Sequence, residues 1–213
     1  MAEKTYEEWL GEMKKLKNYS DAYNLINAVP KELRTPELCL LAIKKDREDS
    51  TPAFLSFVPE ETRTFEMCLA AVKKNSGSMS FVPENHKTRD LCLAYLKQTT
   101  KKKYSNNIYS LPVALWDDDS FCIEAIKANY WAIRVMPEDK RTAEIWLLVL
   151  SNMTPSATLL TEVPKKFWED ASFCVRAMVV VSLIGKTEHI FTTYVPKALQ
   201  QQVVKEHNKA VSG

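Results

Sequence analysis

The sequence contains very little glycine, with four glycines among 213 residues, far below the usual share of roughly 7%. Phosphate-binding loops and tight hairpin turns both depend on glycine, because it adopts backbone conformations that other residues avoid. The scarcity therefore disfavours mononucleotide-binding loops, dinucleotide-binding folds and hairpin-rich sheets. We expect a helical chain.

Long apolar runs are also missing. The longest, from Ala177 to Ile184, spans about eight residues and includes Ser182, whereas a membrane-spanning helix needs about 18 or more. The N-terminal segment has no apolar signal core. Five cysteines are an odd number in a chain that we expect to stay inside the cell, which predicts free thiols in a reducing compartment. We expect a soluble cytoplasmic protein with no membrane partner.

The charges nearly balance, because 29 basic and 27 acidic side chains leave a net charge of +2. Such a balance does not mark a strongly cationic nucleic-acid binder. Apolar residues make up 46% and charged residues 26% of the chain, which is ordinary for a folded soluble protein and excludes a disordered one.

An internal repeat organises the sequence. A proline follows a large apolar residue seven times, at intervals of 24 to 32 residues: Pro30, Pro59, Pro83, Pro112, Pro137, Pro164 and Pro196. Nine or ten positions after each of the first six prolines lies the centre of a second matched block: Cys39, Cys68, Cys92, Cys122, Trp146 and Cys174. Six aligned copies identify a tandem repeat protein.

Each repeat predicts two helices. The proline suits the first turn of a short helix, where its missing N–H needs no partner. A capping residue then starts a longer helix: Thr35, Thr64, Thr88, Asp119 (or Ser120), Thr142 and Asp170. One such pair cannot bury its own apolar face, so neighbouring pairs must stack. We therefore expect an all-α fold of tandem helix pairs, stacked as an α-solenoid or as a compact helical-repeat bundle.

The repeats predict a single helical-repeat domain over residues 1–213. Residues 1–28 would form an N-terminal cap, 29–194 about six repeats, and 195–213 a C-terminal cap. Within the first segment, the apolar residues are spaced for one amphipathic helix: Tyr6, Trp9, Leu10, Met13 and Leu16. Lys101–Asn107 is the most polar insertion and the best candidate for a mobile loop or a bend.

The segment Glu66-Met67-Cys68-Leu69-Ala70-Ala71-Val72-Lys73-Lys74-Asn75, followed by Phe81-Val82-Pro83-Glu84, resembles a repeat found in many bacterial proteins of unknown function. The resemblance covers residues 29–196 and is most specific in the second and third units. It implies a bacterial or phage origin and a helical-repeat fold, and it implies no activity. The fifth unit departs from the pattern, because Trp146 takes the place of the cysteine.

The sequence gives little support for a catalytic site or a metal site. The cysteines lack the close pairs of structural zinc sites and are better explained as small buried apolar residues. No histidine has the i, i+4 partner of a metalloprotease site, and no serine or cysteine has the glycine-flanked turn that exposes a nucleophile. The histidines are His86, His189 and His207. Asp117 to Asp119 precede a helix and are expected to cap it, because a calcium loop would need a glycine and a terminal glutamate. We expect no enzyme, no cofactor and no metal site.

Lysines close the long helices of the first four repeats, at Lys44, Lys73, Lys97 and Lys127. They either complement the negative end of the helix dipole or align into a basic edge that meets an acidic protein or a phosphate backbone. Tyr130 and Trp131 precede the next proline and are candidates for an exposed anchor. The candidate partner-binding residues are Lys44, Lys73, Lys74, Lys97, Lys101, Lys102, Lys103, Tyr130 and Trp131.

The functional prediction follows from the repeat class. Stacked repeats bind partners through extended surfaces assembled from neighbouring units. We expect a non-catalytic protein-binding module, specifically a stoichiometric inhibitor or immunity-type protein that blocks a partner such as a bacterial toxin. The alternative is a helical repeat that binds nucleic acid through its lysine-rich edge.

Overall fold

The computed structural model describes residues 4–48, 50–100, 108, 111–153, 157–182 and 191–212. Every regular element within these ranges is a helix, which confirms the all-helical prediction. Residues 1–115 and 116–213 form two compact units, which are described separately. Repeats occur in both units, and the expectation of one domain stays a prediction. Lys101–Asn107, the predicted loop or bend, lies outside the described residues.

The first unit alternates ten- or eleven-residue α-helices with short 3₁₀-helices. The α-helices are α1 (Tyr6–Lys15), α2 (Tyr19–Ala28), α3 (Pro36–Lys45), α4 (Phe65–Lys74) and α5 (Arg89–Thr99). The 3₁₀-helices are η1 (Lys31–Leu33), η2 (Phe54–Phe57), η3 (Glu60–Thr62), η4 (Ser76–Phe81) and η5 (Glu84–His86), while η6 (Val113–Asp117) crosses the boundary between the units.

The second unit continues the alternation. Its α-helices are α6 (Asp119–Ala128), α7 (Ala143–Asn152), α8 (Lys165–Trp168), α9 (Ala171–Ser182) and α11 (Lys197–Ser212). Its 3₁₀-helices are η7 (Tyr130–Arg134), η8 (Glu138–Lys140) and η9 (Ala157–Glu162).

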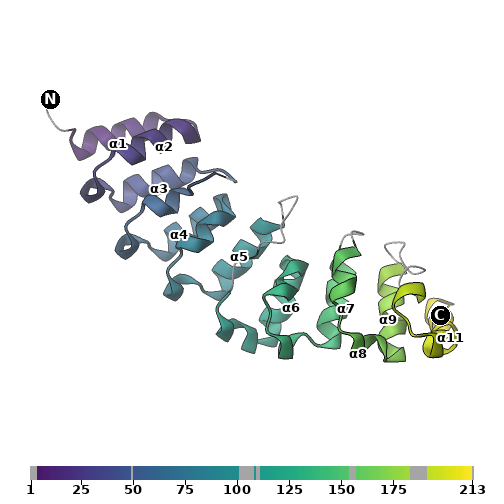
Figure 1. Ribbon diagram of the computed structural model, residues 1–213. Coiled ribbons are helices and arrows are strands. Elements are labelled where there is room, and N and C mark those ends of the chain that lie inside the picture. The colour runs from purple at the N-terminus through teal and green to yellow at the C-terminus, as the bar shows by residue number, and fades with distance from the viewer. Residues whose placement is uncertain are drawn as a thin grey trace. The chain divides into compact units, whose positions relative to one another are not determined.

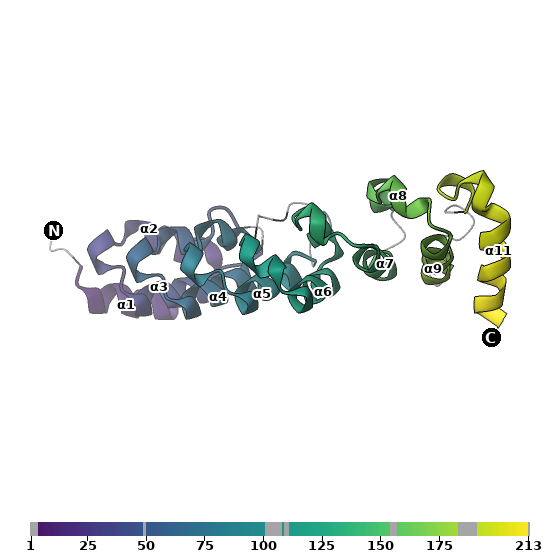
Figure 2. The same ribbon diagram turned by 90° about the horizontal axis from the view of Figure 1, so that it is seen from below.

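The long helices pack in chain order within each unit. In the first unit α1 contacts α3, α3 contacts α4, and α4 contacts α5 (Figure 1). In the second unit α6 contacts α7, α7 contacts α9, and α9 contacts α11. Figure 2 shows α3, α4 and α5 side by side from a second direction. Packing between successive copies is the arrangement expected of helical repeats.

The predicted threonine caps are confirmed. Thr64 Oγ1 accepts a hydrogen bond from the backbone N–H of Met67 at 3.3 Å, and the same cap occurs at Thr35, Thr88 and Thr142. The cap predicted at Asp119 or Ser120 is wrong by one residue. Asp118 has the extended backbone of a cap and accepts from the N–H of Ser120 at 2.8 Å, while Asp119 is already helical.

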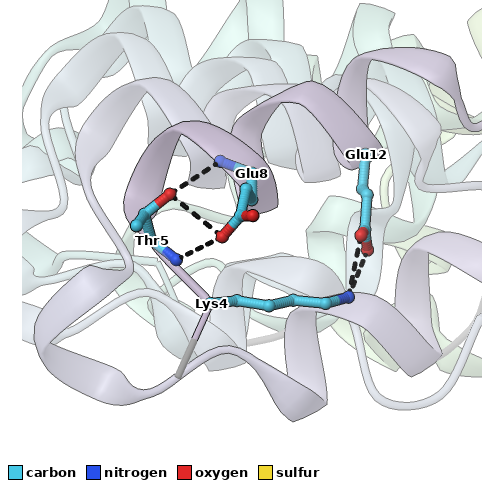
Figure 3. Close-up of polar contacts among 4 residues, drawn as sticks. All are labelled: Lys4, Thr5, Glu8 and Glu12. Atoms are coloured by element: carbon cyan, nitrogen blue, oxygen red, sulfur yellow. Dashed lines mark hydrogen bonds and ion pairs between the residues drawn. The ribbon is translucent and has the colours of Figure 1, made fainter. Parts of the chain in front are cut away.

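The helix predicted over Tyr6 to Leu16 is confirmed, and the same N-terminal segment contains a second helix that was not predicted. The first helix, α1, ends at Lys15, Leu16 is its C-terminal cap, and α2 follows. Thr5 and Glu8 form a reciprocal capping box (Figure 3): Thr5 Oγ1 accepts from the Glu8 N–H at 3.4 Å, and Glu8 Oε2 accepts from the Thr5 N–H at 2.7 Å. The backbone hydrogen bond from Thr5 lowers the pKa of the Glu8 carboxyl.

The α1 helix is itself a repeat helix, because Thr5 and Trp9 have the spacing of Thr142 and Trp146. The repeat therefore begins about 25 residues before the first proline that marks it in the sequence. Sequence reasoning missed this copy because no proline precedes it.

The short helix predicted after each proline is a single 3₁₀ turn in four repeats. In one of these repeats the N–H of Thr62 bonds to the carbonyl of Pro59 at 3.0 Å, and the N–H of Arg63 bonds to that of Glu60 at 3.1 Å. The proline lies just before this turn and does not open an α-helix. Only three residues separate the proline from the arginine or lysine that precedes the capping threonine, and these form the single turn. Pro164 differs, since it is followed by the α-helix α8.

The repeated blocks form the core. Each of the helices α3, α4, α5, α6, α7 and α9 buries the cysteine-column residue, its preceding neighbour and the residues three and four positions later. In α3 these are Leu38, Cys39, Ala42 and Ile43. Tyr95 and Val149 replace the recurring alanine and are also fully buried. Each large apolar side chain buried in this way contributes about 1.5–3 kcal/mol to stability. Most of the buried apolar side chains lie on the α-helices, so these helices supply most of the apolar stabilisation.

An arginine four residues after the proline connects successive repeats. Arg63 Nε donates to the carbonyl of Val58 at 3.0 Å, and Arg63 Nη1 donates to the carbonyl of Phe81, in the next repeat, at 2.8 Å. Arg34 makes the equivalent bonds to the carbonyls of Val29 and Phe57. These charged donors satisfy carbonyls that the short helices leave without intrahelical partners.

Candidate interaction surface

The candidate lysines of the first unit lie at the C-terminal ends of its long helices. Lys44, Lys73, Lys74 and Lys97 belong to α3, α4 and α5, and all four are exposed. None forms an ion pair with any residue that the structure describes. Lys101, Lys102 and Lys103 lie outside the described residues.

Carboxylates lie at the opposite ends of the same helices. Glu37, Glu66 and Asp90 each occupy the first turn of α3, α4 or α5, two residues before the cysteine. Acidic first turns and basic last turns complement the helix dipole. Each long helix therefore presents a carboxylate at one end and an ammonium group at the other.

A groove of about 510 Å³ lies between α4 and α5. Half-buried Leu69, Leu93 and Ala94 supply its apolar surface. Lys73 and Lys97 line it as cations, and the other lining residues are Asp90 and Gln98. The Gln98 side-chain amide donates to Glu48 Oε2, so this residue is held within the protein.

A groove of about 430 Å³ lies at the equivalent place in the second unit, between α6 and α7. Counted from the cysteine column, four of its lining residues occupy the positions of four residues in the first groove. Ile123 corresponds to Leu69, Lys127 to Lys73, Glu144 to Asp90, and Leu148 to Ala94. Ile123 is 40% exposed, so an apolar side chain is available there too.

The charges of the second groove are largely neutralised by neighbouring side chains. Lys140 Nζ lies 3.9 Å from Asp119 Oδ1. Arg176 of α9 makes a two-pronged contact with the Glu144 carboxylate, and its hydrogen bond lowers the pKa of Glu144. Lys127 is left without an ion-pair partner among the described residues. In the first groove, by contrast, neither Lys73 nor Lys97 has an ion-pair partner within the part of the chain that the structure describes.

The aromatic candidates lie in η7 of the second unit. Tyr130 and Trp131 are half-buried, with ring centroids 5.4 Å apart. The guanidinium of Arg134 covers the Trp131 ring at 4.4 Å and also pairs with Glu162. Trp131 is thus held between neighbouring side chains, and neither aromatic residue lines the groove between α6 and α7.

The five cysteines are buried and unbridged. Burial raises the pKa of the Cys39, Cys68 and Cys174 thiols to about 11 and that of Cys92 to about 12. Cys39 donates its S–H to the carbonyl of Arg34 at 3.4 Å. These properties confirm the packing interpretation, since a reactive thiol needs a lowered pKa. Across the described ranges, no cluster of three or more histidine, cysteine or acidic side chains could hold a metal.

Sequence reasoning identified the lysines but missed the grooves beside them. The signal was a second column of apolar residues, one position after the cysteine: Leu40, Leu69, Leu93, Ile123, Leu147 and Val175. From the sequence alone, the apolar residues of this column are expected to be buried in the core. Leu147 is buried, and the other members are at least partly exposed. Their exposure depends on how closely neighbouring helices approach, which the sequence does not give.

None of the described helices is both long enough and apolar enough to cross a membrane. No protein-family model matches the chain, and no curated protein or solved structure is significantly similar to it.

Proposed function

We propose that this chain is a non-catalytic protein-binding module. More specifically, we propose a bacterial cytoplasmic inhibitor of the immunity type, which binds one partner protein such as a toxin and blocks it. The observation that carries the proposal is the recurrence of one groove in both units, with an apolar surface and charges at equivalent positions.

Partly exposed apolar side chains lower the stability of an isolated surface but contribute to binding when a partner covers them. The two grooves are open, and each has cationic and anionic side chains around apolar ones. This combination suits a protein surface, in which apolar anchors are surrounded by charged groups. Stacked helices also hold such a surface in a fixed shape, which reduces the entropy lost on binding.

Nucleic-acid binding is the second candidate, and the unpaired lysines of α3, α4 and α5 favour it. Phosphate contacts need cations along a continuous track. Here the lysines share their groove with a carboxylate, because Asp90 lines it together with Lys73 and Lys97. Protein binding therefore agrees better with the charges.

The test is affinity capture from lysate of the source cells with the full chain as bait, with and without nuclease. The proposal expects one protein at a near-equimolar ratio to the bait, retained after nuclease treatment. The captured protein should lose its own activity when the purified chain is added back. Recovery of nucleic acid alone, or of proteins that nuclease removes, would favour the second candidate.

A further inference from the structure

The groove between α4 and α5 has two lysines without an ion-pair partner among the described residues, whereas its counterpart has one. Its charged lining groups are two ammonium groups, Lys73 and Lys97, and one carboxylate, Asp90. The groove between α6 and α7 is lined by two cations and two carboxylates, and the carboxylates are already paired. The first groove is therefore the more attractive of the two for an anionic ligand.

Its apolar residues specify a second property of the ligand. Leu69 and Leu93 are half-buried, and Ala94 leaves room where Leu148 stands in the other groove. A leucine-sized side chain from a partner would remove this apolar surface from water. The ligand must therefore combine negative charge with an apolar anchor.

A polypeptide segment provides both properties in a short length of chain. A phosphate backbone provides the charge but no aliphatic anchor, and single-stranded bases bind aromatic platforms, whereas this groove is lined by aliphatic residues. Asp90, at the N-terminal end of α5, would repel carboxylates of the bound segment. These carboxylates would therefore lie near Lys73 and Lys97, at the C-terminal ends of α4 and α5.

We infer that the groove between α4 and α5 binds an acidic segment of the partner protein, with an aliphatic side chain on Leu69 and Leu93 and carboxylates against Lys73 and Lys97. The inference rests on the proposed protein-binding function and identifies which part of the chain recognises which chemistry. Lys44 and Lys74 extend the same positive charge along the ends of α3 and α4.

The test uses a fluorescein-labelled peptide of repeated Glu-Glu-Leu units. The full chain is titrated into the peptide at low salt, and binding is measured by fluorescence anisotropy. We expect saturable binding that weakens about tenfold or more in the variant K73E/K97E, because two attractive contacts become repulsive. The matched control is K205E/K209E, which reverses two exposed lysines of α11 that line neither groove, and it should change the affinity less than about twofold. Circular dichroism melts of all variants check the fold.

Two further arms test the apolar contribution. Ala94→Leu introduces the side chain that the second groove has at this position, and it should weaken peptide binding about fivefold without altering the salt dependence. A peptide with serine in place of leucine should bind at least about tenfold more weakly. An oligonucleotide of the same charge should not displace the leucine-containing peptide.

Several results would overturn the inference: no saturable binding, equal loss with K205E/K209E, equal binding of the serine peptide, or preferential binding of the oligonucleotide. The proposed function is judged separately by affinity capture. If the captured partner is retained by K73E/K97E, the proposed function stands and this inference fails. If the peptide binds as described but no protein is captured, the inference stands for this surface and the inhibitor role fails.

Discussion

Lys14 Nζ lies 3.3 Å from Glu37 Oε1, so an ion pair joins α1 to α3. Counted from the cysteine column, these are the positions of Lys73 in α4 and Asp90 in α5. The latter two side chains line a groove and form no ion pair with any described residue. The same repeat geometry thus gives a bridged boundary at the start of the chain and an open one between α4 and α5.

The arginine that connects repeats should be among the most important polar residues for stability. Arg63→Ala removes two charge-assisted hydrogen bonds and leaves the carbonyls of Val58 and Phe81 without this donor. We expect the free energy of unfolding to fall by about 2–3 kcal/mol, measured by urea denaturation. Arg63→Lys should recover part of the loss, because Lys87 occupies the equivalent position in the next repeat.

Lys14→Ala is the matched control for this variant, because it also removes a cation that joins two repeats. Both partners of its ion pair are more than half exposed, so the change should be less than about 0.5 kcal/mol. A loss in Arg63→Ala no larger than that in Lys14→Ala would contradict the role given to the arginine.

The threonine caps make a second, smaller contribution. Thr64→Ala removes the hydroxyl that accepts from the N–H of Met67, and the free energy of unfolding should fall by about 1 kcal/mol. Thr64→Ser keeps the hydroxyl and should lose only a few tenths of a kcal/mol. Equal losses in the two variants would show that the methyl group, and not the cap, is what matters.

The thiols should be unreactive in the folded protein. Because burial raises the pKa of Cys68 to about 11, about one thiol in a thousand is ionised at pH 8, and the thiolate is the reactive form. We expect Ellman's reagent to label no cysteine quickly in native buffer and all five in denaturant. Rapid labelling of any one of them before unfolding would identify an exposed thiol and contradict the packing interpretation.

The same shift predicts a loss of stability in alkali. Unfolded thiols ionise near their ordinary pKa of 9.0, while folded Cys68 keeps its proton to about pH 11. The folded state then binds more protons than the unfolded state, so stability falls as the pH rises through this window. In urea titrations at about pH 8 and about pH 10.5, Cys68→Ala should show a shallower decline than the wild type. Parallel declines would exclude this contribution.

Much of the fold could be predicted from the sequence because the repeat carries its own signals. A threonine followed four residues later by a cysteine or tryptophan marks a cap and a buried position on one helix, and both depend on local geometry. The copy that starts at Thr5 has this signal too. No proline precedes this copy, so the proline spacing does not mark it.

The connecting elements could not be predicted in the same way. After the short turn that follows Pro59, the Arg63 side chain bonds to the carbonyl of Phe81, and no local sequence pattern specifies this distant partner. The grooves depend similarly on the spacing between helices. A column containing Leu69 and Leu93 looks like core in the sequence, and only the packed structure leaves it half exposed.

The most direct test of the binding role is a titration of the captured partner into the purified full chain, followed by calorimetry. The account predicts a saturable complex with a one-to-one ratio that nuclease does not affect, and a partner that is inactive within it. A purified candidate that gives no heat and stays active at saturating concentrations of the chain would contradict the central claim.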